Sequence, residues 1–174
     1  IMKACEALKT DEINSLITAP INKLNIKNYK NDFIGHTELL GKEFEGAPLM
    51  MMVSDIMKIT FITGHIPISK LKSSITTKNI VTKTKVFNSS LKHDFNVLKP
   101  KIAILGLNPH AGENGMLGEE EDKFISPAIK ELQKLDILAY GPFPADSFFS
   151  DKNLSFFDGI IAMYHDQGLI PFKT

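Results

Sequence analysis

The sequence predicts an α/β fold, with helices layered on both faces of a central sheet. Short apolar runs typical of strands alternate along the chain with longer segments in which apolar residues recur at helical spacing. The clearest strand is residues 101–106, because its apolar run is nearly continuous, as in strands buried on both faces. The composition, 43% apolar and 23% charged, is that of an ordinary globular domain.

The first half of the chain contributes helices and a hairpin. Apolar residues at helical spacing predict a helix over residues 1–8, and a short apolar run before Pro20 predicts a strand over 15–18. A further helix is expected to begin near His36 and end at Phe44. Two apolar runs, 49–53 and 59–63, lie close enough in sequence to pair as a hairpin, so the sheet need not be purely parallel.

The second half continues the alternation of helices and strands. Pro67 favours the start of a helical stretch, and a longer helix follows whose apolar face includes Ile80, Thr84, Phe87 and Leu91. After strand 101–106, the pattern predicts the following elements: a glycine-rich loop, a helix over about 120–135, and strands over 137–140 and 159–163.

Length and charge narrow the classes of protein. The 174 residues suit one domain, or one domain and part of another. Twenty basic and twenty acidic side chains cancel, so net charge gives no reason to expect nucleic acid or a membrane surface as a partner. No apolar run is long enough to span a bilayer. The single cysteine, Cys5, fits a reducing cytoplasm. Both ends lack polar tails, so we expect a fragment truncated at both ends.

Four histidines lie where an apolar run breaks into a turn marked by Gly or Pro: His36, His65, His110 and His165. In open α/β sheets, ligands bind where the strands end, so these imidazoles are expected along one edge. Three of them would suit a divalent metal and leave a position open for substrate. The alternative for each histidine is structural, because a histidine in a turn often caps a helix or makes one hydrogen bond.

Asp146 and Asp166 lie at or near the same strand ends. Each is a candidate for orienting a metal-binding imidazole or for acting as a general acid or base. The competing interpretation is helix N-capping, a common role of aspartate after a turn. Lys23 and Lys173 are cations in predicted turns, and each is either a substrate-binding group or an ordinary solvated lysine.

The loop after strand 101–106 carries Gly112, Gly115 and Gly118. Their spacing matches neither dinucleotide nor P-loop glycine patterns, so we expect a loop whose backbone approaches a ligand closely. The acidic run 119–121 is expected to favour the positive N-terminus of the next helix.

Several strings together resemble the 4-hydroxythreonine-4-phosphate dehydrogenase family, and they occur in the family's order over nearly the whole chain. The strings are Thr-Ala-Pro-Ile-Asn-Lys at 18–23, Gly-His-Thr-Glu at 35–38, Thr-Gly-His-Ile-Pro at 63–67, Leu-Asn-Pro-His-Ala-Gly-Glu at 107–113, Gly-Pro-Phe-Pro-Ala-Asp at 141–146 and Ala-Met-Tyr-His-Asp-Gln-Gly-Leu-Ile-Pro at 162–171.

The resemblance implies an isocitrate/isopropylmalate dehydrogenase-like fold and a homodimer. The chain would be the central and C-terminal part of a two-domain dehydrogenase, with a domain boundary that the sequence does not locate. In the family, the residues that match His65, His110 and His165 bind a divalent metal shared between subunits, for which zinc is our first choice and magnesium or cobalt the alternatives. The residues that match His36, Thr37 and Lys173 bind substrate. NAD, or in some members NADP, is used without a glycine fingerprint, and no residue is assigned to it.

The implied reaction is NAD-dependent oxidation and decarboxylation of 4-phosphooxy-L-threonine to 3-amino-2-oxopropyl phosphate, a cytoplasmic step in pyridoxine 5′-phosphate biosynthesis. A related dehydrogenase acting on 4-phospho-erythronate or 4-phospho-threonate is the nearest alternative. A metal hydrolase with a histidine-bound water and a non-enzymatic binding or dimerisation module are the alternatives from other classes.

Overall fold

The computed structural model describes residues 1–19, 36–44 and 48–174, which belong to two compact units, Ile1–Pro48 and Leu49–Thr174. The first unit contains helix α1 (Met2–Lys9) and helix α3 (His36–Glu43), both of which were predicted. Within this unit, Lys9 Nζ lies 3.2 Å from Glu43 Oε2. The side chain of Cys5 is buried.

The strand predicted over residues 15–18 is wrong, because this segment has no regular secondary structure. Ile17, at its centre, is 96% exposed. A strand is stable only when its backbone pairs with another strand, and the described residues of this unit offer none. The apolar residues of segment 15–18 therefore do not contribute a strand to this unit.

The second unit is built on a five-stranded sheet with the order β1-β2-β5-β3-β4. The first pair, β1 and β2, is the predicted antiparallel hairpin, whereas β2, β5, β3 and β4 run parallel to one another. The last strand in the sequence therefore lies in the middle of the sheet. The strand bounds are β1 (Met51–Val53), β2 (Lys58–Phe61), β3 (Lys101–Leu105), β4 (Leu138–Phe143) and β5 (Gly159–Ala162).

Helices and helical turns connect these strands. The longest helix begins after Thr76, whose side chain accepts a hydrogen bond from the backbone N–H of Asn79 at 3.2 Å, a typical N-cap. The bounds are η1 (Ile68–Lys70), α4 (Leu71–Ser74), α5 (Thr77–His93), η2 (Pro109–Gly115), η3 (Glu121–Ile125), α6 (Ser126–Lys134), α7 (Ala145–Phe148), α8 (Asp151–Phe156) and α9 (His165–Lys173).

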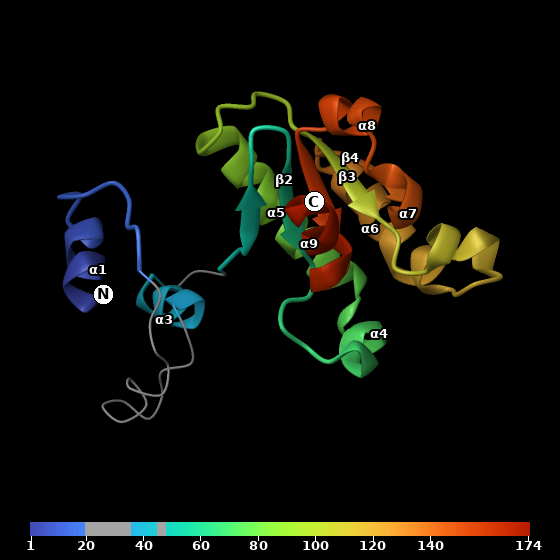
Figure 1. Cartoon of the computed structure of the whole chain (residues 1–174), viewed down its shortest axis with the longest axis horizontal. Helices are drawn as coiled ribbons and strands as arrows, with labels where there is room; N and C mark the ends of the chain where they lie inside the picture. The colour runs from blue at the N-terminus through green and yellow to red at the C-terminus, as the bar shows by residue number, and fades with distance from the viewer. Residues whose placement is uncertain (20–35, 45–47) are drawn as a thin grey trace. The chain divides into compact units, whose positions relative to one another are not determined.

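Helices cover both faces of the sheet, which confirms the predicted layers (Figure 1). Successive side chains of a strand point to opposite faces, so Ile102 and Ile104 pack in the same core as α5 and α6. Ala103 and Leu105 point the other way, into a core shared with residues of α7 and α9. A strand buried on both faces reads as a continuous apolar run, which is why 101–106 is so clear in the sequence.

Two predicted regions differ in detail. The helix expected over 120–135 is a π-helical turn, η3, followed by α6. Residues 165–173, interpreted from the sequence as a turn followed by a lysine in a second turn, instead form helix α9, and Lys173 lies in its last turn. Gly168 explains the close packing of α9, because a Cβ there would lie 2.7 Å from side-chain atoms of Ile59 and Phe61 in β2. Among the described residues, no helix combines the length and apolarity needed to cross a membrane.

Candidate functional site

The candidate site lies where the parallel strands end. His65 follows β2, His165 follows β5, His110 follows β3 and Asp146 follows β4. Because these four strands are parallel and adjacent in that order, the four residues lie along the same edge of the sheet. The predicted gathering of strand ends is therefore present, with His65 and His165 on neighbouring strands.

His65 and His165 come together. Their ring centroids lie 4.9 Å apart with the rings inclined at 48°. Neighbouring strands are about 4.8 Å apart, so residues that follow β2 and β5 directly are brought to this spacing by the sheet itself. Both imidazoles line a cavity of about 320 Å³ whose other walls are Gly64, Ile66, Ile68, Leu71, Tyr164 and Asp166.

His165 is the first residue of α9, and Asp166 beside it fixes its ring. His165 Nδ1 lies 2.6 Å from Asp166 Oδ1, within hydrogen-bond distance. A carboxylate that accepts from Nδ1–H leaves Nε2 as the free lone pair, the arrangement found in metal-binding histidines. This contact is compatible with the orienting role, one of the two roles predicted for Asp166, and both roles stay predictions.

Gln167, the next residue, was missed by sequence reasoning. Its Oε1 accepts from the backbone N–H of Met163 at 2.7 Å, and its Nε2 donates to the carbonyl of Gly106 at 2.6 Å. The side chain thus ties the start of α9 to the ends of both β5 and β3. The sequence feature that could have identified Gln167 is its position next to His165 and Asp166 in the family string at 162–171.

His110 lies apart from this pair, on the loop η2, and is exposed. Asp146 lies in the first turn of α7, which packs against η2, and it is also exposed. The N-cap of α7 is Pro144, so the N-capping alternative for Asp146 is wrong. Within the described part of a single chain, no three His, Cys, Asp or Glu side chains form a cluster able to hold a metal.

Asn108, Glu120 and Glu121 form a second group that sequence reasoning missed. The acidic run was expected only to favour the next helix, but Glu120 and Glu121 turn back toward the loop and accept hydrogen bonds from Asn108 Nδ2 at 2.8 and 2.9 Å. The hydrogen bond from Asn108, with a second from Lys72, lowers the pKa of Glu120 to about 2. Asn108, Glu120 and Lys72 line a further cavity of about 500 Å³, which shares Ile68, Leu71 and Tyr164 with the first.

The three residues matched to substrate binding belong to two helices, one in each unit. His36 and Thr37 begin α3 in the first unit, and Lys173 is exposed near the far end of α9. At 1.5 Å per residue, Lys173 lies about 12 Å along the helix from His165. Lys23 lies outside the described residues.

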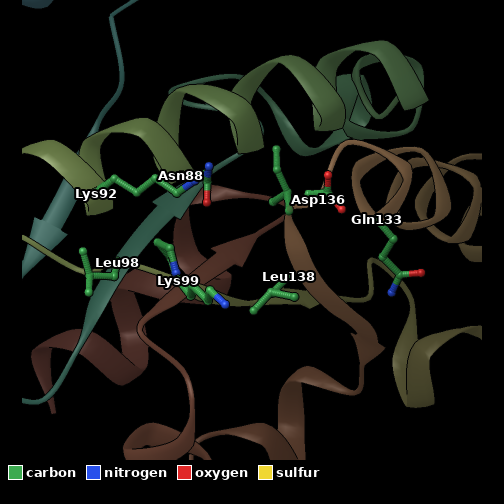
Figure 2. A pocket seen from close by; sticks show the side chains of 9 residues that line it. Asn88, Lys92, Leu98, Lys99, Gln133, Asp136 and Leu138 are labelled. Atoms are coloured by element: carbon green, nitrogen blue, oxygen red, sulfur yellow. The ribbon is translucent and has the colours of Figure 1, made fainter.

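A cavity of about 490 Å³ lies away from these residues, at the end of the sheet where β3 and β4 begin (Figure 2). Asn88 and Lys92 of α5 form one wall, and Lys99 and Leu138 lie opposite them. It contains none of the predicted site residues, and ligands in α/β sheets bind at the other ends of the strands. We therefore place the candidate site at the histidine edge.

Comparison with known proteins identifies relatives over the full sequence. The family model described as "Pyridoxal phosphate biosynthetic protein PdxA" matches residues 1–174. A 4-hydroxythreonine-4-phosphate dehydrogenase from Bacteroides thetaiotaomicron is 42% identical over 174 residues, covering 99% of this chain and 48% of the relative. The chain therefore spans about half the length of the curated relatives it matches.

Solved structures of other proteins have the same fold as this chain. The crystal structure of a 4-hydroxythreonine-4-phosphate dehydrogenase from Klebsiella pneumoniae has a TM-score of 0.92 and 32% identity, covering 98% of this chain and 52% of that one. A terephthalate 1,2-cis-dihydrodiol dehydrogenase from Burkholderia xenovorans has a TM-score of 0.79 at 24% identity, with 98% and 54% covered, which shows a common fold alone. Because the match extends over every residue and the fold agrees, the chain belongs to the PdxA family of pyridoxal phosphate biosynthetic proteins.

Proposed function

We propose that the complete protein oxidises and decarboxylates 4-phosphooxy-L-threonine with NAD, giving 3-amino-2-oxopropyl phosphate for pyridoxine 5′-phosphate biosynthesis. Relatives named 4-hydroxythreonine-4-phosphate dehydrogenase support the reaction class. The observation that carries the proposal is the pair of imidazoles, His65 and His165, at the ligand-binding edge of the sheet. Two adjacent histidines with one ring oriented by a carboxylate suit metal-assisted oxidation of a hydroxyl group.

The geometry of this pair fits a metal ion. Two imidazoles would hold one divalent ion between them only if their rings lie close together. The observed separation is 4.9 Å. Imidazole donors suit zinc or cobalt better than magnesium, which prefers oxygen ligands. Zinc therefore stays the first choice, and His65 and His165 are its first two ligands.

His110 is the proposed third ligand, supplied by the second protomer of a homodimer. It is exposed on a loop one strand further along the same edge, where a second protomer can reach it. His65 is exposed as well, so the pair is open to a residue from outside the chain. A site completed in this way would exist only in the dimer.

Oxidation removes a hydride from C3 of the substrate and a proton from its hydroxyl group, and the C–C bond to the carboxylate then breaks to release carbon dioxide. NAD would accept the hydride, and the metal, when bound, would lower the pKa of the hydroxyl and stabilise the negative charge of decarboxylation. Asp166, 2.6 Å from Nδ1 of His165, would hold the proton on that nitrogen. The proposed role of Lys173, His36 and Thr37 is to bind the substrate's charged and polar groups, and of Asp146 to move a proton.

The test uses the complete protein, loaded with zinc and supplied with NAD and 4-phosphooxy-L-threonine. The expected result is NADH absorbance with release of one carbon dioxide per NADH. Activity only with 4-phospho-erythronate or 4-phospho-threonate would redirect the proposal to a related dehydrogenase. The dihydrodiol dehydrogenase with the same fold shows why the assay is needed, because a fold does not determine its substrate.

Two results would reject a dehydrogenase altogether. Phosphate release without NADH would favour a metal hydrolase. Purified protein that contains no metal by elemental analysis, and takes up none, would favour a binding module in which the histidines only close turns.

A further inference from the structure

The loop that carries His110 has a strained backbone. Residues His110, Ala111, Gly112, Glu113 and Asn114 have φ angles of 52°, 50°, 81°, 43° and 55°. A left-handed conformation is disfavoured for residues with a Cβ, and here four of five consecutive residues have one. Such a conformation persists only when surrounding structure holds it, and it is common at functional sites.

Glu121 holds this loop at its start. The backbone N–H groups of Leu107 and Asn108 both donate to Glu121 Oε1, at 2.7 and 2.8 Å. The Asn108 side chain donates to Oε2 at 2.9 Å. The glutamate is 3% exposed, so these donors replace water around its carboxylate.

The loop is folded tightly over the same carboxylate. A Cβ on Gly112 would lie 2.7 Å from Glu121 Oε2, and Gly112 itself has a φ of +81°. A Cβ on Gly106 would lie 3.2 Å from Oε1. Glycine at both positions lets the backbone approach the carboxylate from two sides.

Stability alone is a weak explanation for a carboxylate in this position. A buried charge is costly unless it is paired, and no cation forms an ion pair with Glu121 among the described residues. Glu120, next to it, has Lys72 at 3.0 Å, and Glu119 is exposed and paired with Lys123. Favouring the helix N-terminus would not require burial either, because Asp122 is an exposed carboxylate in the same first turn.

We propose that Glu121 is a positioning residue for His110, fixing the loop in its strained conformation so that the imidazole is presented to the metal. This inference rests on the proposed function, in which His110 is a metal ligand. Asn108 is the bridging side chain, because its amide donates to both Glu120 and Glu121.

The experiment measures zinc affinity of the complete protein by chelator competition, together with thermal unfolding. Glu121→Gln keeps the shape of the side chain but puts an amide group where three N–H donors need acceptors. We expect zinc affinity to fall about tenfold or more, the size seen for residues that support metal ligands, while unfolding stays cooperative. Glu119→Gln is the matched control and should leave zinc affinity unchanged. Unchanged affinity in a folded Glu121→Gln variant would overturn the inference.

A double variant separates positioning from general structural damage. If Glu121 acts through His110, adding Glu121→Gln to His110→Ala should cause little further loss of zinc affinity, whereas independent effects would add. Additive losses would overturn the inference. Should His110→Ala alone leave zinc affinity unchanged, the proposed metal site fails instead, whatever Glu121 does.

Asn108→Ala provides the decision if Glu121→Gln does not fold. This variant leaves the two backbone donors to Glu121 in place and removes only the side-chain bridge. A smaller loss of zinc affinity in the same direction supports the positioning role. Wild-type affinity in the folded Asn108→Ala protein contradicts it.

Discussion

His165 and His110 follow neighbouring strands, β5 and β3, but the protein holds them in different ways. His165 begins an ordinary helix, and its position is set by regular backbone and by Gln167, which bridges two strand ends. His110 lies in a left-handed turn held over the buried carboxylate of Glu121. One histidine is placed by secondary structure, and the other by a specific buried side chain. The His110 side of the site should therefore be the more easily disturbed by a single substitution.

The largest effect should come from removing either imidazole in the complete protein. His165→Ala and His110→Ala are each expected to bind zinc much more weakly and to lose turnover, because two remaining ligands hold the ion poorly. Metal content and NADH formation are the measurements. Full activity of His110→Ala with an empty metal site would contradict the assignment.

Mixing these two inactive variants sharpens the comparison. If each site takes His65 and His165 from one protomer and His110 from the other, a mixed dimer has one intact site. After reassortment of equal amounts, half the dimers are mixed, so about a quarter of wild-type activity should return. No recovery in dimers shown to have exchanged subunits would mean that one chain supplies all three histidines.

The next effect should come from Gln167→Glu. The new carboxylate still accepts from the N–H of Met163 but faces the carbonyl of Gly106, so we expect about 2–3 kcal/mol less stability and weaker zinc binding. Gln133→Glu is the control, since Gln133 Nε2 donates to the carbonyl of Ala139, away from the histidines. Chemical denaturation and chelator competition should show a stability loss in both variants, but weaker zinc binding in the Gln167 variant alone.

The layers and the histidine edge could be predicted because they depend on local pattern. Alternating strands and helices force parallel strand ends to one edge, and 101–106 is buried on both faces. The strand order could not be predicted. The last strand, β5, lies between β2 and β3, and only this long-range pairing brings His165 beside His65.

The support of the His110 loop was hidden for a different reason. Ala111 and Glu113 adopt positive φ although neither residue type favours it, so local propensity predicts no left-handed turn there. Glu121 belongs to an acidic run that suits any helix start, and its contacts with Leu107 and Asn108 appear only when the loop folds back. The failed strand at 15–18 is the reverse case, an apolar run without a pairing partner among the described residues.

A smaller effect is expected where α9 packs on the sheet. Gly168→Ala would place a Cβ 2.7 Å from side-chain atoms of Ile59 and Phe61, so overpacking should cost about 1–2 kcal/mol of unfolding free energy. Gly64→Ala is the matched control beside the other paired histidine, because nothing lies within 4 Å of its Cβ position. Its stability should change by less than about 0.5 kcal/mol. Equal losses in the two variants would show that close packing at Gly168 is not the cause.

The smallest effect concerns the ion pair beside the His110 loop. Lys72 is 83% exposed, so Lys72→Ala should cost less than about 1 kcal/mol at neutral pH.

The pKa of Glu120 is lowered from 4.5 to about 2, first by Asn108 and then by Lys72. A lowered folded-state pKa gives stability that is complete above pH 4.5 and lost as the pH falls toward 2. Comparing the unfolding free energies of wild type and Glu120→Gln between pH 7 and 2.5 should show a difference that shrinks only below about pH 4.5. Lys72→Ala should keep most of this acid dependence, because the partly buried amide of Asn108, rather than the exposed ammonium, is its main source. Loss of the whole dependence in Lys72→Ala would assign it to the ion pair.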